Sequence, residues 1–352
     1  MIATEYIESR LTRAGLPTPR GDLSAAILAS LRDRERPPPG PEAVVSAADP
    51  YGGDVQLALY VLYELHYQGF DGVDDDREWD PELLRLRGEL ERRYLDALRA
   101  DAPGTVGAEA ALAQILAEPA DDGTGVSHYL QHDGRLEQLR EYAALRSLYH
   151  LKEADPHAWV IPRLHGRAKA AMVAVEFDEF GAGRAEDIHA RLFADLMDDL
   201  GLEHAYGRYV DESPDEALAP VTMMSLLGLH RALRGALVGH FAAVEVTSSP
   251  GSHRLAEAMR RAGAGPATQR FYDEHVEADA VHEQVVRHEI ITPLLRDEPH
   301  LEPDVVFGIE ATGLLEERLG THLLREWRQG RSALRKPLRA GEDGTACEGA
   351  TR

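Results

Sequence analysis

Two histidines and an aspartate lie on one stripe of a predicted helix, in the segment FYDEHVEADAVHEQVV. His275, Asp279 and His282 follow one another at intervals of four and three residues, which places them on the same side of an α-helix. Phe271 and Val286 share this stripe, so it is the apolar face that turns inward. Imidazole and carboxylate groups are costly to bury without a partner. The pattern therefore indicates either a metal site or a hydrogen-bonded polar pair within the core.

Glu245 lies in a second predicted helix, within a stretch that has no lysine or arginine over residues 235–249. A carboxylate in such surroundings must be protonated, meet a distant partner or bind a metal, unless it reaches solvent at the end of the helix. Glu245 is therefore a second candidate ligand, with solvent exposure as the alternative.

Three further candidates stand between these helices and the N-terminus. Glu179 and His189 flank the glycine-containing segment FGAGR, so we expect Glu179 to close one helix and His189 to lie in the first turns of the next. Glu186, three residues before His189, is an alternative to Glu179, and the acidic residues here could equally form a solvated loop. Glu153 follows Lys152 and, taken alone, is typical of a surface residue.

Together, these segments favour a metal centre over four unrelated polar groups. Several helices would each deliver carboxylate or imidazole groups inward, which is how helix bundles build sites for two metal ions. Mixed carboxylate and imidazole ligands suit iron or manganese, and the single cysteine, Cys347, cannot form a thiolate zinc site. Several carboxylates are neutralised by two divalent ions better than by one.

The elements that would position these groups are helices. Apolar residues recur every three or four positions in seven segments, namely 55–68, 81–100, 135–153, 186–202, 220–247, 268–293 and 306–328. No convincing alternation of period two occurs, so we expect an all-α fold. Proline and glycine predict loops at 34–53, 118–127, 180–184 and 248–252. We expect an N-terminal helical region at 1–130, a helix bundle at 131–335 and a disordered tail at 336–352.

Charge and hydropathy limit the partners. The chain has 352 residues with 61 Asp+Glu against 38 Lys+Arg, a formal net charge of -23. This balance argues against binding to nucleic acid or to an anionic membrane. No uncharged apolar stretch reaches the roughly 18 residues of a transmembrane helix, and the start lacks a signal region, so we expect a cytoplasmic protein. We expect a homodimer on general frequency.

The sequence resembles the haem-oxygenase-like di-iron oxidases, also described as iron-containing redox enzymes. The resemblance rests on LKEADPHAWVIPRL, DEFGAGR, the apolar helix around Glu245 and FYDEHVEADAVHEQ, and it extends from about Glu64 to Leu334. It implies a haem-oxygenase-like bundle without haem, in which two Fe(II) ions react with O₂. The ligand order of the family falls here on Glu153, Glu179, His189, Glu245, His275, Asp279 and His282.

The resemblance also implies an activity. Family members N-oxygenate amines, carry out oxidative decarboxylation or carbon–carbon cleavage, or oxidise their own side chains. An extra carboxylate, here Glu179, favours N-oxygenation. We therefore expect an oxygenase of specialised metabolism that acts on a small amine or amino-acid-derived metabolite, with an external electron donor as a further partner. We expect His275 and Glu179 on one iron, and Glu153 and His282 on the other.

A ferritin-like iron-binding protein is the rival interpretation. The ligand order of ferritin-like di-iron bundles can be traced through Glu153, Glu186, His189, Glu245, Asp279 and His282. In that order Asp279 replaces the usual glutamate, and His275 and Glu179 have no role. Both interpretations predict a di-iron site.

Overall fold

Helices form the regular structure of the molecule. The computed structural model describes residues 13–40, 49–116 and 125–338, apart from the side chains of Glu277, Asp279 and Ala280. Within these ranges no residue belongs to a β-strand, which confirms the predicted all-α class. No helix in the described part of the chain is long and apolar enough to cross a bilayer.

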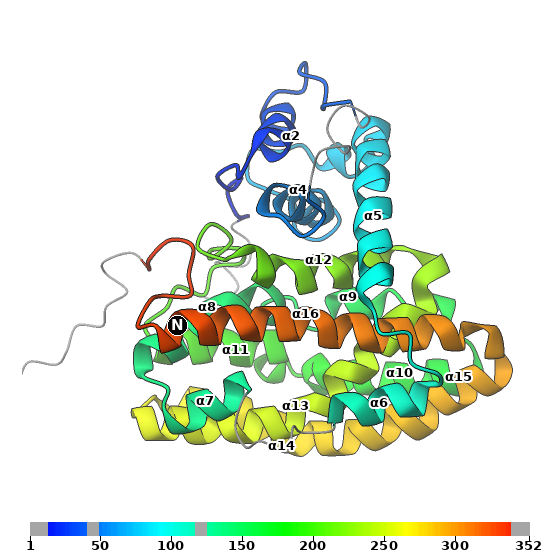
Figure 1. The fold of residues 1–352 in the computed structure, drawn as a ribbon, viewed down its shortest axis with the longest axis vertical. Coiled ribbons are helices and arrows are strands. Elements are labelled where there is room, and N and C mark those ends of the chain that lie inside the picture. Colours follow the sequence, from blue (N-terminus) through cyan, green and yellow to red (C-terminus); the bar gives the residue numbers. More distant parts are fainter. Residues whose placement is uncertain (1–12, 41–48, 117–124, 339–352) are drawn as a thin grey trace, which may run out of the picture.

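A group of N-terminal helices sits on one side of a larger bundle (Figure 1). These helices are α2 (Asp22–Arg32), α4 (Gly53–Glu64) and α5 (Pro81–Asp101). Helix α4 is buried along nearly its whole length and packs on α12 (Asp215–Leu229), while α5 runs down to the bundle and contacts α16 (Glu302–Arg328). The N-terminal helices therefore share a core with the bundle, through residues such as Leu59 and Leu226.

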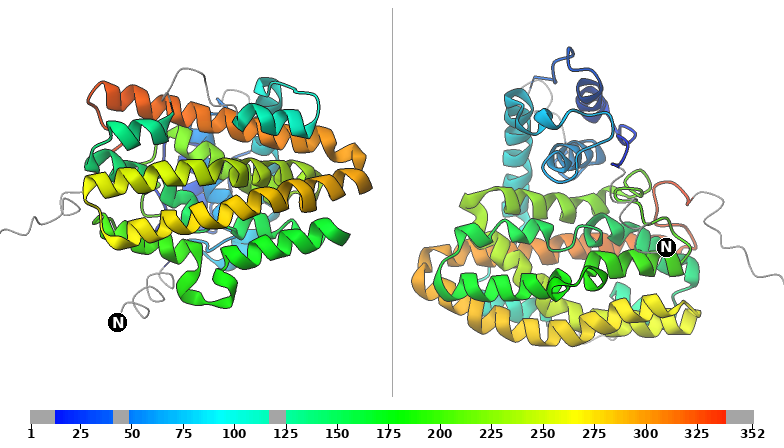
Figure 2. Two further views of the ribbon diagram at one scale, coloured as in Figure 1. Left: turned by 90° about the horizontal axis from the view of Figure 1, so that it is seen from below. Right: turned by 180° about the vertical axis from the view of Figure 1, so that it is seen from behind.

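The bundle is built around the long helices α13 (Arg234–Ala262), α14 (Pro266–Val285) and α16. Figure 2 shows α13 and α14 running side by side, and both pack against further helices. The remaining elements of the bundle are α6 (Ala108–Leu116), α7 (Val126–His132), α8 (Leu136–His150), α9 (Asp155–Ala158), α10 (Gly166–Glu179), α11 (His189–Asp199), a π-helical turn (Val286–Ile291) and α15 (Thr292–Asp297). Helix α6 contacts α13 and α16, although it lies within the predicted N-terminal region 1–130.

Glycines allow α13 and α16 to approach closely. A Cβ atom added to Gly239 of α13 would lie 2.0 Å from the carbonyl oxygen of Val305, and one added to Gly308 of α16 would lie 1.9 Å from that of Ala236. Both neighbours are backbone atoms, which cannot turn away as a side chain can. The contact matters for the site because α13 carries Glu245.

Replacing Gly308 with alanine is expected to lower the free energy of unfolding by at least the roughly 1–3 kcal/mol that is typical of an overpacked core. The added methyl group would force the two helices apart along their whole contact. Gly313→Ala on the same helix is the control, because its nearest neighbour is a side-chain atom of Ile115 at 3.4 Å. In urea denaturation, the midpoint of Gly308→Ala should be lower than that of the wild type. The midpoint of Gly313→Ala should be equal to that of the wild type or higher, since alanine favours the helix. A midpoint of Gly308→Ala equal to that of the wild type would contradict the close contact.

Two predicted boundaries are wrong. The segment 248–252 is not a loop but part of α13, with Pro250 inside the helix, because packing of α13 on α14 overrides the local signals. The segment 220–247 is not one helix, since α12 ends at Leu229 and a short 3₁₀ turn precedes α13. The guanidinium of Arg163 donates to the carbonyl oxygens of Gly228 and Leu229 and so satisfies the end of α12. Most of the predicted disordered tail, residues 339–352, lies outside the described residues.

Candidate metal centre

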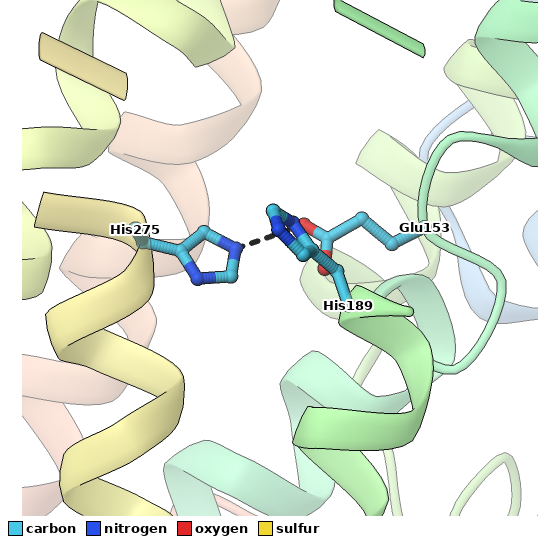
Figure 3. A group of neighbouring side chains, drawn as sticks. All are labelled: Glu153, His189 and His275. Atoms are coloured by element: carbon cyan, nitrogen blue, oxygen red, sulfur yellow. Dashed lines mark ion pairs between the residues drawn. The ribbon is translucent and has the colours of Figure 1, made fainter. Parts of the chain in front are cut away.

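The first cluster consists of one carboxylate and two imidazoles that meet from three elements. Its members are Glu153, His189 and His275, all buried, and one ligand atom of each lies within 4.8 Å of those of the other two. The Nε2 atom of His275 lies 3.8 Å from Oε1 of Glu153, and the rings of His189 and His275 have centroids 4.5 Å apart. Figure 3 shows these side chains converging from α14, from the start of α11 and from the turn after α8.

The second cluster consists of two carboxylates and one imidazole. Its members, Glu179, Glu245 and His282, are buried and also lie within 4.8 Å of one another through one ligand atom each. The Nδ1 atom of His282 lies 3.1 Å from Oε2 of Glu245 and 3.7 Å from Oε1 of Glu179. These residues come from α13, from α14 and from the end of α10.

The two clusters touch through Glu179 and His189. Oε2 of Glu179 lies 2.9 Å from Nδ1 of His189, so a residue of one cluster contacts a residue of the other. The grouping differs from the expected one. His275 lies with Glu153 rather than with Glu179, and His282 lies with Glu179 rather than with Glu153.

Turns and helix ends bring three of the cluster residues, Glu153, Glu179 and His189, into the centre of the bundle. Glu153 stands in the turn between α8 and α9, and the next residue, Ala154, has a φ of 72°, in the left-handed region that a non-glycine residue seldom adopts. Glu179 is the last residue of α10 and His189 the first of α11. Gly181 lets the connection fold back, because its φ is 73° and an added Cβ atom would lie 2.7 Å from the backbone at Asp187.

Neighbouring groups fix the orientation of two cluster residues. Nδ1 of His275 donates a hydrogen bond to the carbonyl oxygen of Phe271 at 2.7 Å, which assigns the proton to Nδ1 and turns Nε2 toward Glu153. Nδ1 of His150 lies 2.9 Å from Oε1 of Glu153. Such outer partners orient metal ligands and adjust their basicity.

The electrostatics of the clusters are those of charged groups held out of water. Burial alone would raise the pKa of Glu153, but His150 and His275 hold it well below its usual range. Burial opposes protonation of His189, yet Glu179 raises the pKa of that imidazole above its ordinary value. A metal ion bound at the first cluster would therefore displace a proton from His189.

The residues fit iron. Oxygen Oε2 of Glu153 is buried and has no hydrogen-bond partner, and the ion-pair partners of Glu153 and Glu179 in the described part of the chain are histidines alone. Neither lysine nor arginine therefore compensates these two carboxylates. Three carboxylates and three imidazoles form a donor set of nitrogen and oxygen that suits iron or manganese.

A small cavity opens onto both clusters. It has a volume of about 10 Å³, room for roughly one water-sized molecule. Its wall contains cluster residues together with Tyr149, His157, Phe241, Val244 and Ser248. Burial, followed by Glu153 and Glu179, holds the pKa of Tyr149 well above its usual range, so its phenol keeps its proton.

Six of the seven predicted ligands come together in these clusters. The seventh, Asp279, belongs to α14, but its side chain lies outside the described part of the structure. Glu186 is exposed on the short 3₁₀ turn before α11, so the ferritin-like order is not assembled. His240 of α13 is not part of either cluster and is buried beside Thr312, with 2.8 Å between Nδ1 and Oγ1.

Sequence reasoning missed two buried polar residues near the clusters, His157 and Glu176. His157 lines the cavity, and its ring lies tilted against that of His240, with 5.2 Å between the ring centroids. Burial raises the pKa of Glu176 to about 9, with Glu179 and Glu245 adding to the effect. The available signal for Glu176 was its position three residues before Glu179, after the apolar run AAMVAV.

Fold and site together define an all-α, haem-oxygenase-like bundle whose buried histidine and carboxylate groups fit iron binding. Residues 140–317, half of the chain, match the model of the iron-containing redox enzymes, and the chain belongs to that family of oxidoreductases. It is also similar to a nitrosourea synthase from Streptomyces achromogenes subsp. streptozoticus, with 27% identity over 170 residues. The match covers 47% of this chain and 36% of that protein, so the chain spans about a third of the length of this relative.

Proposed function

We propose that this protein is a non-haem di-iron oxygenase that uses O₂ to N-oxygenate a small amine or amino-acid-derived substrate in specialised metabolism. The observation that carries the proposal is the pair of buried clusters joined by the contact between Glu179 and His189. Glu153, His189 and His275 would hold one iron, and Glu179, Glu245 and His282 the other. Asp279, at the position between His275 and His282 on α14, is a further proposed ligand.

Two ferrous ions supply the electrons for O₂ activation when they are bound, one electron each. In N-oxygenation, one oxygen atom of O₂ enters an N–H bond to give N–OH, and the other leaves as water. The reaction consumes two electrons and two protons, so an external electron donor is needed to restore the ferrous state for a further turnover.

The protein's own residues prepare the site for this chemistry. Nδ1 of His150, 2.9 Å from Oε1 of Glu153, can hold that carboxylate in its orientation toward the first cluster. The phenol of Tyr149, which stays protonated, can donate a hydrogen bond at the cavity wall. The apolar side chains of Phe241 and Val244 keep bulk water from the same cavity.

Two observations favour nitrogen as the atom that is oxidised. Glu179, the extra carboxylate that is typical of N-oxygenating members, lies in the second cluster, whereas its competitor Glu186 is exposed. The similar protein from Streptomyces is named a nitrosourea synthase, and a nitrosourea is a compound that contains an oxidised nitrogen atom. We therefore rank N-oxygenation above carbon–carbon cleavage.

Oxygen consumption by Fe(II)-loaded protein tests the proposal. With a panel of amines, guanidines and amino acids, at least one substrate is expected to accelerate O₂ uptake and to give a product 16 mass units heavier. The added oxygen should carry the label from ¹⁸O₂, and His282→Ala, which lacks a cluster ligand, should abolish both effects.

Other outcomes would contradict the proposal. Iron oxidation without any organic product would favour an iron-binding protein, and a product that has lost carbon dioxide would favour oxidative decarboxylation. No O₂ uptake under any of these conditions would contradict an oxygenase altogether.

A further inference from the structure

His157 is a buried imidazole at the wall of the small cavity, and it belongs to neither cluster. Only 2% of its surface is exposed, and its Nε2 atom has no hydrogen-bond partner in the described part of the structure. Burial and the nearby His240 hold the pKa of His157 well below its ordinary value, so the ring is neutral. A neutral imidazole has one donor and one acceptor nitrogen, and a buried nitrogen without a partner is destabilising. His157 therefore calls for a reason beyond folding.

Close packing fixes the position of His157. It lies on the short helix α9, which packs on α12. The contact is so close that a Cβ atom added to Gly228 of α12 would lie 2.7 Å from the carbonyl oxygen of Pro156. Three aromatic rings contact the imidazole, namely those of Tyr149, His240 and Phe241, at centroid distances of 6.2, 5.2 and 5.1 Å. The side chain is thus held at the cavity wall rather than free to turn away.

The size of the cavity limits what His157 can bind there. A volume of about 10 Å³ holds one water-sized molecule. Water or a molecule of two atoms is of this size, whereas an amine or an amino acid is much larger. Residues of both clusters line the same cavity, Glu153 and His275 from the first and Glu179 and Glu245 from the second. A small molecule in the cavity would therefore contact His157 and both clusters at once.

We propose that His157 is a binding residue for O₂, whose imidazole forms a hydrogen bond to the O₂ molecule that enters the cavity. The inference rests on the proposed function and adds to it a residue that is not a metal ligand. A donor that is fixed in a site without bulk water stabilises negative charge as it develops on oxygen. The hydrogen bond from His157 would therefore strengthen as O₂ is reduced.

Nitric oxide tests the inference without any turnover, because it is a diatomic molecule that binds ferrous iron. It is added to Fe(II)-loaded protein under anaerobic conditions. Two quantities are measured, the rate at which NO dissociates and the N–O stretching frequency in the infrared. The wild type is compared with His157→Leu, His157→Gln and His240→Leu. His240 is the matched control, because it is as deeply buried as His157 and its ring contacts that of His157, but it does not line the cavity.

NO is expected to dissociate roughly 3- to 10-fold faster from His157→Leu than from the wild type, because one hydrogen bond is lost. The N–O stretching frequency should rise in this variant, since a hydrogen bond draws electron density onto NO and weakens the N–O bond. His157→Gln, whose amide can still donate, should retain part of both effects. It also serves as the test variant if His157→Leu does not fold. His240→Leu should behave as the wild type does in both measurements.

The stability of the metal-free protein separates ligand binding from a role in packing. Nδ1 of His240 donates to Oγ1 of Thr312, whose own proton goes to the carbonyl oxygen of Gly308. His240→Leu loses this hydrogen bond, so its midpoint in urea denaturation should be lower than that of the wild type. His157→Leu removes a nitrogen that has no partner, so its midpoint should equal that of the wild type or exceed it.

Three results would overturn the role of His157. They are equal dissociation rates and N–O frequencies in the wild type and His157→Leu, a loss of bound iron in His157→Leu, which would make His157 a metal ligand, and a loss of stability in His157→Leu as large as that in His240→Leu. A failure of the proposed function is distinguishable from these. In that case NO would still dissociate faster from His157→Leu, but no amine or guanidine would accelerate O₂ uptake by the wild type.

Discussion

Replacing Glu64 with leucine is expected to lower the free energy of unfolding by about 3–5 kcal/mol, the usual effect of removing one partner of a buried ion pair. Glu64 of α4 pairs with Lys152, and each residue is only 1% exposed. The hydroxyl of Tyr206 donates to Glu64 at 2.7 Å, and Nζ of Lys152 lies 4.1 Å from the centre of the Tyr67 ring. Without Glu64, a buried ammonium group would have lost its counter-charge.

A second substitution separates the lost pair from a general loss of packing. The double variant Glu64→Leu/Lys152→Met replaces both charges with apolar groups and should recover most of the stability, since a buried ion pair is seldom better than well-packed apolar residues. Arg34→Ala is the control, because this exposed residue pairs with Asp74 at the surface, where an ion pair contributes little. Urea denaturation gives the free energy of unfolding of Glu64→Leu, of the double variant and of Arg34→Ala. A double variant as unstable as Glu64→Leu would contradict the explanation.

The pair also concerns the metal centre, because Lys152 directly precedes Glu153. The N-terminal helices thereby hold the turn that presents Glu153 to the first cluster. Iron binding by Glu64→Leu should therefore weaken together with its stability, while the double variant should regain both.

The second large effect, a loss of bound iron, is expected from the variants His189→Ala and His282→Ala. Each variant removes an imidazole from a different cluster and leaves two described ligand residues where there were three. Loss of even an outer partner of a metal ligand typically weakens metal affinity by about 10- to 100-fold, and loss of the ligand itself should exceed this. Each variant should thus retain about one iron fewer per chain than the wild type.

The matched control for these variants is His253→Ala, which removes an exposed imidazole from α13. Elemental analysis after anaerobic loading and desalting gives the iron content of all four proteins. If His189→Ala and His282→Ala both kept the iron content of the wild type, the two clusters would not be the iron sites.

Regular helix geometry is what made much of the site predictable. His275 and His282 share a face because seven residues make nearly two turns, and both are buried as predicted. The glycine-containing segment FGAGR predicted correctly that Glu179 ends one helix and that His189 begins another. The apolar surroundings of Glu245 likewise indicated a buried carboxylate.

Tertiary packing decided what the sequence left open. The grouping of ligands depends on how α10, α11 and α14 lie in space, which no spacing along the chain reveals. Glu153 stands in a turn with a left-handed residue at Ala154, not in the predicted helix, and its burial depends on residues far along the chain. Glu176 escaped notice because a lone glutamate in a helix is usually a surface residue.

The iron content of the wild-type protein after anaerobic titration with Fe(II) and desalting tests the central claim most directly. Two buried clusters of three ligands each predict that about two ferrous ions are retained per chain. A lower content after desalting should rise to about two in the titration, if the second ion is held more weakly. A wild-type protein that neither retains nor titrates iron would contradict the account, and the clusters would then be a polar network within the helical core.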